Sequence, residues 1–394
     1  MDVRFSPAMR AALAGLFAMA GAMGVGRFVY TPVLPHMISE AALTASEAGL
    51  VAGANFLGYL LGALAASSSI FAPQRRTWLF LALAASVATT ALMAITGSLS
   101  SMLGLRFLSG VASAFSMIFV TALVLAKLAE ERRPGLIAWH FAGVGLGIAG
   151  SAALVSILSA WQVPWQQMWL AAGAIALICW VALYFLLPAT TVEPARNPLT
   201  ASTRRTITPD LALFIAGYGF FGFGYVITAT FINAMAKAEP ALASIEPWIW
   251  MIVGLSGVPS IWLWNQLAAR TSVTFSYVVA CLVEAAGVCL SVVVISQVAL
   301  VISAILLGGT FMAVTALGLA RARGMAPQNA AGVIAFMTAS FGLGQMIGPV
   351  LAGYLFEHTG NLVAASFCAT FALVAAAALT IISSNLASNA NSPG

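Results

Sequence analysis

Two arginines lie inside long apolar stretches of the sequence. Arg27 follows Gly24 and Gly26 in a run that ends at Pro35, and Arg106 lies near the start of a later run. A cation within a membrane-spanning helix costs about 3 kcal/mol on insertion scales. A buried partner, a water-filled cavity or a ligand must offset this cost. At about 1.5 Å of rise per residue, both arginines lie roughly 10–12 Å below the same predicted membrane surface.

The chemistry of these two side chains suits an anion. Guanidinium groups bind carboxylate, phosphate or sulfate through paired hydrogen bonds. We therefore predict that Arg27 and Arg106 contact an anionic substrate. The alternative is a structural role, in which an arginine donates to carbonyls at a helix end or extends toward the membrane surface. It applies most to Arg106, which lies nearer the end of its span.

Neutral polar and aromatic residues complete the predicted substrate-binding set. Asn55 and Tyr59 lie one helical turn apart, and Tyr30 shares a helix face with Arg27. The neutral candidates are Tyr30, Asn55, Tyr59, Tyr218, Tyr225 and Gln345. Packing without ligand binding is the alternative for each of them. Five tryptophans near span ends are predicted to be anchors at the membrane interface. They are Trp161, Trp165, Trp169, Trp248 and Trp250.

Two titratable residues inside apolar runs are candidates for proton coupling. His140 is one, because histidine gains and loses a proton near neutral pH. Glu284 is the other, because it is the only acid near the centre of a predicted span. The alternatives are a histidine that packs against a backbone carbonyl and a protonated carboxyl that bonds to a neighbouring helix.

The sequence offers no pattern typical of enzymes. It contains no catalytic serine elbow, no His-Glu zinc pair and no nucleotide loop. The four cysteines lack metal-ligand spacing. We therefore expect no enzymatic activity, no metal and no cofactor, with ion or substrate gradients as the energy source.

The composition predicts a helical membrane protein. Of the 394 residues, 7% are charged and 61% hydrophobic, and soluble proteins of this size carry far more charge. Long uncharged apolar runs recur along the whole chain, which predicts an all-α membrane protein. The net charge of +5 falls mainly in short loops, so we expect a lipid bilayer and not nucleic acid as the large partner.

Twelve membrane spans can be drawn. They are residues 8–35, 45–70, 77–97, 99–126, 135–160, 165–188, 210–235, 246–269, 272–295, 298–320, 329–356 and 361–385. The longest connection is rich in Pro, Thr, Ser and Arg. It divides the chain into an N-terminal six-helix bundle (1–188), a cytoplasmic linker (189–209) and a C-terminal six-helix bundle with a short cytoplasmic tail (210–394).

The two halves show internal similarity. Gly24 and Gly26 align with Gly222 and Gly224 at an offset of 198 residues. Two six-span halves with the same orientation imply a pseudo-twofold axis along the membrane normal. In this arrangement, a substrate site lies between the halves near the middle of the membrane.

The positive charges predict the orientation. If the N-terminus is cytoplasmic, thirteen of the 16 Lys and Arg lie in inner segments, and Lys237 is the only one in an outer loop. This asymmetry places both termini in the cytoplasm. The inner set is Arg4, Arg10, Arg75, Arg76, Lys127, Arg132, Arg133, Arg196, Arg204, Arg205, Arg270, Arg321 and Arg323. We expect a multi-pass protein of the bacterial inner membrane.

Together these features resemble the major facilitator superfamily of transporters, and the run GVGRFVYTPVLP at 24–35 resembles its YbfB/YjiJ branch. The resemblance implies a monomeric carrier that works by a rocker-switch. Spans 1, 4, 7 and 10 would line the cavity, and spans 3, 6, 9 and 12 would face lipid. The chain departs from the superfamily pattern after span 2, because the loop that ends at Arg75 and Arg76 contains no acid. These arginines are expected to cap helix ends or to meet lipid phosphates.

The combined prediction is a secondary active transporter of a small, carboxylate-like organic anion that works by alternating access, with proton symport as the coupling. The rivals are an efflux pump for hydrophobic compounds or drugs, which the aromatic residues around Tyr218 and Tyr225 favour, and a sugar carrier, for which Asn55 and Gln345 supply neutral groups. A membrane sensor that keeps a carrier fold but does not transport is a third alternative.

Overall fold

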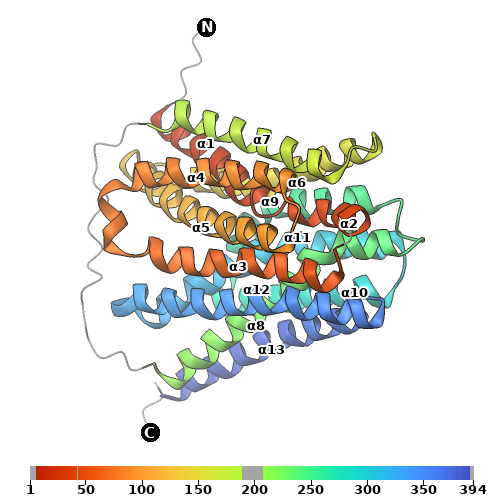
Figure 1. The fold of residues 1–394 in the computed structure, drawn as a ribbon. Coiled ribbons are helices and arrows are strands. Elements are labelled where there is room, and N and C mark those ends of the chain that lie inside the picture. The colour runs from red at the N-terminus through yellow and green to blue at the C-terminus, as the bar shows by residue number, and fades with distance from the viewer. Residues whose placement is uncertain (1–5, 42, 189–206, 391–394) are drawn as a thin grey trace. The chain divides into compact units, whose positions relative to one another are not determined.

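The structure is a computed structural model that describes residues 6–41, 43–188 and 207–390. All regular structure within these ranges is helical (Figure 1). The α-helices are α1 (Pro7–Met19), α2 (Tyr30–Ala41), α3 (Ala45–Ala66), α4 (Arg75–Leu92), α5 (Leu99–Glu130), α6 (Ile137–Ala160), α7 (Trp165–Leu186), α8 (Pro209–Ala238), α9 (Glu246–Arg270), α10 (Val273–Val293), α11 (Gln297–Met325), α12 (Ala330–Thr359) and α13 (Val363–Ala390).

The described residues contain 12 helical segments that are long and apolar enough to cross a membrane. The first of them, Pro7–Glu40, joins α1 and α2 through a π-helical segment, Ala20–Val25. Each predicted span overlaps one of these segments, with ends that differ by a few residues. The predicted all-α architecture with twelve membrane helices is therefore confirmed.

Serine side chains fix the starts of two corresponding helices. The Ser98 hydroxyl accepts from the N–H of Ser101 at 3.3 Å before α5, and the Ser296 hydroxyl accepts from the N–H of Ala299 at 3.1 Å before α11. Such caps satisfy a donor that a helix start would otherwise leave unpaired. The two caps are 198 residues apart, which equals the offset of the glycine pairs in the two halves.

Arginine side chains satisfy carbonyls at the end of α7. Arg76 donates to the carbonyl of Pro188 at 2.8 Å, and Arg10 donates to that of Phe185 at 2.9 Å. The expectation that Arg76 caps a helix end is confirmed. These contacts hold the start of α4 and the start of α1 against the same helix end.

Helices α7 and α13, the sixth and twelfth spans, present large apolar side chains at the surface. Phe185 and Phe371 are about 70% exposed, and Ile178 and Phe367 are also exposed. Apolar surface of this kind is stable next to lipid hydrocarbon. Its position agrees with the lipid-facing role that the resemblance implies for these two spans.

The chain forms two compact units. The first contains the described residues of Met1–Leu43, Ala54–Asn197 and Trp250–Val258, and the second those of Thr44–Gly53, Pro198–Ile249 and Pro259–Gly394. Two helices are divided between the units. Residues 45–53, the start of α3, belong to the second unit, and Trp250–Val258, a part of α9, belongs to the first. The sequence-based division into 1–188 and 210–394 stays a prediction. Most of the predicted linker, residues 189–206, lies outside the described residues.

Close backbone contact within the first unit fixes α6 against the π-helical segment. Gly24 and Gly147 face each other, and a Cβ atom on either one would overlap the backbone of the other segment. Small residues allow membrane helices to approach in this way. The contact positions the chain just before Arg27.

Candidate functional site

The first membrane span is interrupted where Arg27 lies. The π-helical segment Ala20–Val25 is followed by turns at 26–29, and α2 begins at Tyr30. The N–H of Gly26 reaches back to the carbonyl of Gly21 at 2.8 Å, which is the wider π spacing. Single π turns occur often at functional sites. Non-helical backbone at membrane depth is tolerated only where protein or water satisfies its polar groups.

Arg106 supplies hydrogen bonds to this interruption. Its Nη1 donates to the carbonyl of Gly26 at 3.0 Å, and its Nη2 donates to that of Arg27 at 2.8 Å. The Ser109 hydroxyl also donates to the Gly26 carbonyl, at 3.1 Å. Arg106 is 2% exposed and lies in α5. The structure thus places Arg106 in the helix-end arrangement that was the alternative to substrate contact.

Trp250 satisfies the next carbonyl of the interruption. Its indole N–H donates to the carbonyl of Phe28 at 3.2 Å, and the rings of the two residues lie 6.2 Å apart. Arg106 and Trp250 together therefore bond to three consecutive carbonyls, those of Gly26, Arg27 and Phe28. These bonds satisfy carbonyls of the interruption, so that it can lie inside the protein.

The Arg27 side chain points to aromatic rings. Its guanidinium carbon lies 3.9 Å from the centre of the Tyr59 ring and 4.8 Å from that of Phe56, both in α3. Arg27 is 4% exposed. Rings occupy the face of a guanidinium group, whereas its N–H donors lie in its plane. Stacking of this kind uses the face of the guanidinium group and not its in-plane donors.

Tyr30 and Asn55 lie around Arg106. The Arg106 guanidinium carbon is 5.2 Å from the Tyr30 ring centre and 5.5 Å from that of Trp169. The Asn55 side-chain amide donates to the carbonyl of Arg106 at 2.9 Å. The structure thus brings together five of the sequence-predicted residues in the first unit: Arg27, Tyr30, Asn55, Tyr59 and Arg106.

The other three predicted residues lie in the second unit. The Gln345 amide of α12 donates to the Tyr225 hydroxyl of α8. The Tyr225 ring stacks on Phe341 and Phe311 at 5.8 and 5.9 Å. Tyr218 stacks on Phe341 at 5.1 Å. Together with Phe221, these residues form a buried aromatic cluster with one amide.

Sequence reasoning missed several members of both groups. Phe56 gave a signal, since it lies one helical turn before Tyr59. Trp169 and Trp250 were predicted to be interfacial anchors, and this prediction is wrong because they are 0% and 1% exposed. Their indole groups contact Arg106 and the Phe28 carbonyl instead.

The remaining tryptophans differ among themselves. Trp165 is also buried, at 3% exposure, so the anchor prediction is wrong for it as well. Trp161 and Trp248 are 74% and 50% exposed, as interfacial anchors should be. Phe311 and Phe341 gave no signal, because each is one apolar residue among many in its helix.

The two candidates for proton coupling are both fully buried. His140 Nε2 lies 3.0 Å from the Thr121 hydroxyl, and its Nδ1 faces Gly15, where a Cβ atom would overlap it. Glu284 of α10 interacts with Thr310 of α11. The Thr310 hydroxyl itself donates to the carbonyl of Leu306 at 2.6 Å. Both carboxyl oxygens of Glu284 are buried and have no hydrogen-bond partner among the described residues.

Potential metal ligands do not cluster in the described part of the chain. No group of three or more His, Cys, Asp and Glu side chains gathers among the residues at 6–41, 43–188 and 207–390. What these residues offer is a buried cation on aromatic rings, an interrupted helix and, in the other unit, an aromatic cluster.

Comparison with known proteins gives a consistent result. Residues 19–381 match the family model "Uncharacterised MFS-type transporter YbfB". The "Uncharacterized MFS-type transporter YceJ" of Bacillus subtilis (strain 168) is 24% identical over 233 residues. This match spans 57% of this chain and 57% of that protein, so it covers little more than half of the relative.

Solved structures share the fold. A mutant of the nucleoside transporter NupG matches with a TM-score of 0.75 at 13% identity, over 95% of this chain and 99% of that one. A bacterial homologue of the human lysosomal transporter Spinster, in an inward-facing and unoccupied conformation, matches with a TM-score of 0.66 at 14% identity and covers 96% of both chains. At these identities the likeness concerns the fold alone.

Proposed function

The chain belongs to the YbfB-type family of the major facilitator superfamily, and from this premise we propose that it carries a small organic anion across a bacterial inner membrane by alternating access. The family and the structural neighbours are transporters and not enzymes. The protein is therefore a multi-pass membrane transporter for small molecules. The anionic substrate, the proton coupling and the location in the bacterial inner membrane are proposals.

Arg27 is the observation that carries the proposal. Its guanidinium group is buried in a membrane-spanning segment and stacks on Tyr59 and Phe56. A carboxylate can bind in the guanidinium plane through two parallel hydrogen bonds. The rings exclude water from the face of the group and so strengthen this interaction.

The electrostatics around Arg27 also favour an anion. Arg106 adds a second positive charge close enough to interact with it. The acids of the helices that carry Arg27, Tyr59 and Arg106 lie near helix ends, as Glu47 and Glu130 do. A cationic substrate would meet repulsion here.

Arg106 is assigned a positioning role in this proposal. Both of its terminal nitrogens donate to backbone carbonyls of the interrupted span. It thereby holds Arg27 at its place in the helix interruption and adds positive potential. Tyr225 and Gln345, which bond to each other in the second unit, stay predicted substrate-binding residues.

Proton symport is the proposed coupling, with Glu284 and His140 as candidate proton carriers. Glu284 is supported by its full burial and by the Thr310 hydroxyl, whose proton is directed to Leu306. His140 is supported by its contact with Thr121. The distribution of Lys and Arg supports cytoplasmic termini.

A ligand screen tests the anion proposal. Thermal unfolding of the purified protein is followed with small carboxylates, phosphates, sulfonates, sugars, nucleosides and lipophilic cations, for wild type, Arg27→Gln and Arg27→Lys. We expect a carboxylate to raise the unfolding temperature of wild type. The same carboxylate should raise that of Arg27→Gln much less. An equal shift in wild type and Arg27→Gln would contradict the assignment of Arg27.

Efflux of hydrophobic compounds is the second candidate function. The stacked rings of Tyr225, Phe311 and Phe341 support it, because flat apolar ligands bind well to such clusters. Stabilisation by lipophilic cations alone, with no response to any anion, would favour this function over anion transport.

A further inference from the structure

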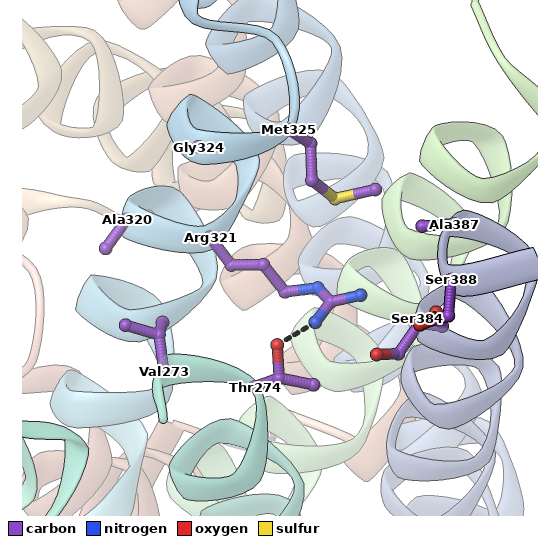
Figure 2. Close-up of a pocket in the computed structure, with 9 residues that line it drawn as sticks. All are labelled: Val273, Thr274, Ala320, Arg321, Gly324, Met325, Ser384, Ala387 and Ser388. Atoms are coloured by element: carbon purple, nitrogen blue, oxygen red, sulfur yellow. Dashed lines mark hydrogen bonds between the residues drawn. The ribbon is translucent and has the colours of Figure 1, made fainter. Parts of the chain in front are cut away.

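A groove lies where three helices of the second unit end or begin. It has a volume of about 400 Å³ and is lined by the start of α10 and the ends of α11 and α13. Figure 2 shows the Arg321 side chain extending across it from α11 toward Thr274 of α10 and toward the serines of α13. None of these residues belongs to the proposed substrate site.

The Arg321 guanidinium group is fixed at the groove. One terminal nitrogen donates to the Thr274 hydroxyl and the other to the Ser383 hydroxyl at 3.2 Å. The group also lies 4.9 Å from the ring centre of Phe214. Its Nε is buried and has no hydrogen-bond partner among the described residues. The positive charge is therefore held beside the groove and does not extend freely into solvent.

The polar groups of the groove suit an anion. Thr274, Ser384 and Ser388 contribute hydroxyl groups, and no acid is among the described lining residues. The start of α10 adds the partial positive charge of a helix N-terminus. Asp210 in the first turn of α8 interacts with Arg321 electrostatically but does not line the groove.

The apolar part of the groove suits an acyl chain. Val273 and Met325 line it. Phe275 and Leu386, which neighbour lining residues in the sequence, are 52% and 42% exposed. A ligand with an anionic head and an apolar tail would match both kinds of surface.

The level of the groove in the membrane identifies such a ligand. Three candidate spans end or begin there, at Val273, Met325 and Ser388. Lipid headgroups lie at this level, and basic pockets between membrane helices bind anionic headgroups. We propose that this groove binds the phosphate group of an anionic phospholipid, with Arg321 as the charged contact. The proposal is independent of the transported substrate.

Native mass spectrometry of the full chain in detergent tests the proposal. The probes are phosphatidylglycerol, zwitterionic phosphatidylcholine and glycerol 3-phosphate, a phosphate ester without acyl chains. The variants are Arg321→Gln and Arg323→Gln, where Arg323 is an exposed arginine on the same helix. We expect phosphatidylglycerol to bind wild type and Arg323→Gln equally and to bind Arg321→Gln about tenfold more weakly.

A second variant keeps the charge and fills the groove. Ala387→Trp places a large side chain in the groove wall, and we expect it to reduce phosphatidylglycerol binding as well. This variant decides the question if Arg321→Gln does not fold. Unchanged phosphatidylglycerol binding in either variant would overturn the proposal. Binding of glycerol 3-phosphate as tight as that of the lipid would also overturn it, in favour of a soluble phosphate ligand.

Discussion

Arg27 and Arg106 are both buried guanidinium groups, yet they make different kinds of contact. Arg106 donates to backbone carbonyls, whereas Arg27 stacks on the rings of Tyr59 and Phe56. The same residue type thus has a proposed positioning role in one place and a proposed binding role in the other. The difference follows from the interruption of the first span, whose carbonyls need donors.

Arg106→Gln tests the positioning role. The shorter side chain leaves the carbonyl of Arg27 without its guanidinium donor, whereas the Gly26 carbonyl keeps the Ser109 hydroxyl. A buried unsatisfied group costs about 1–3 kcal/mol. We expect a clear drop in the unfolding temperature measured in detergent without ligand. Ser109→Ala is the control, because it removes one donor and leaves Arg106 in place, so its effect should be smaller. Unfolding of Arg106→Gln at the wild-type temperature would contradict the role.

Tyr59 tests the stacking on Arg27. Tyr59→Leu removes the ring, and cation–π contacts contribute about 0.5–2 kcal/mol. We expect anion affinity, measured by calorimetry, to fall about threefold to thirtyfold in this variant. Tyr59→Phe keeps the ring and should bind close to wild type. If both variants bind alike, the ring is not what supports Arg27.

At the scale of helices, the contact between α6 and the π-helical segment determines where Arg27 lies. Gly147→Ala introduces a Cβ that would overlap Ala20 and Gly24, and such overpacking costs about 1–3 kcal/mol. We expect lower thermal stability and weaker anion binding. Gly150→Ala on the same helix is the matched control, since a Cβ there has no neighbour within 4 Å. Equal effects of the two substitutions would show that this contact does not position the site.

The helices could be predicted from sequence, but the interruption could not. Twelve long apolar runs separated by charges predict twelve membrane helices. Caps such as Ser98 and Ser296 fix where helices start. The glycines before Arg27 indicate only that the backbone can bend. The turns at 26–29 depend on donors from distant helices, here Arg106 and Trp250.

The sequence made some residues of the candidate site stand out, but not those whose position depends on tertiary packing. Asn55, Tyr59 and Arg27 stand out as polar or charged groups in apolar helices, so their types made them candidates. The burial of Trp169 and Trp250 depends on tertiary packing. An indole near a span end has the same local sequence whether it faces lipid or the interior.

At the scale of the whole molecule, the proposed proton coupling depends on Glu284 and His140. Glu284→Gln keeps the size and hydrogen-bonding ability of a protonated carboxyl, so we expect folding and thermal stability close to wild type. In proteoliposomes we expect the variant to exchange substrate but to lose accumulation driven by a pH gradient. His140→Gln is measured in parallel. Accumulation by Glu284→Gln at the wild-type level would exclude Glu284 as the coupling group.

The most direct test of the central claim is counterflow exchange of a radiolabelled carboxylate, chosen by the ligand screen, in proteoliposomes. Wild type, Arg27→Gln and Arg27→Lys are compared at equal amounts of folded protein. Loss of a charged hydrogen-bond pair reduces binding about 10- to 100-fold, so we predict rapid exchange by wild type, weak exchange by Arg27→Lys and almost none by Arg27→Gln. Exchange by Arg27→Gln at the wild-type rate would contradict the claim that Arg27 contacts the transported anion.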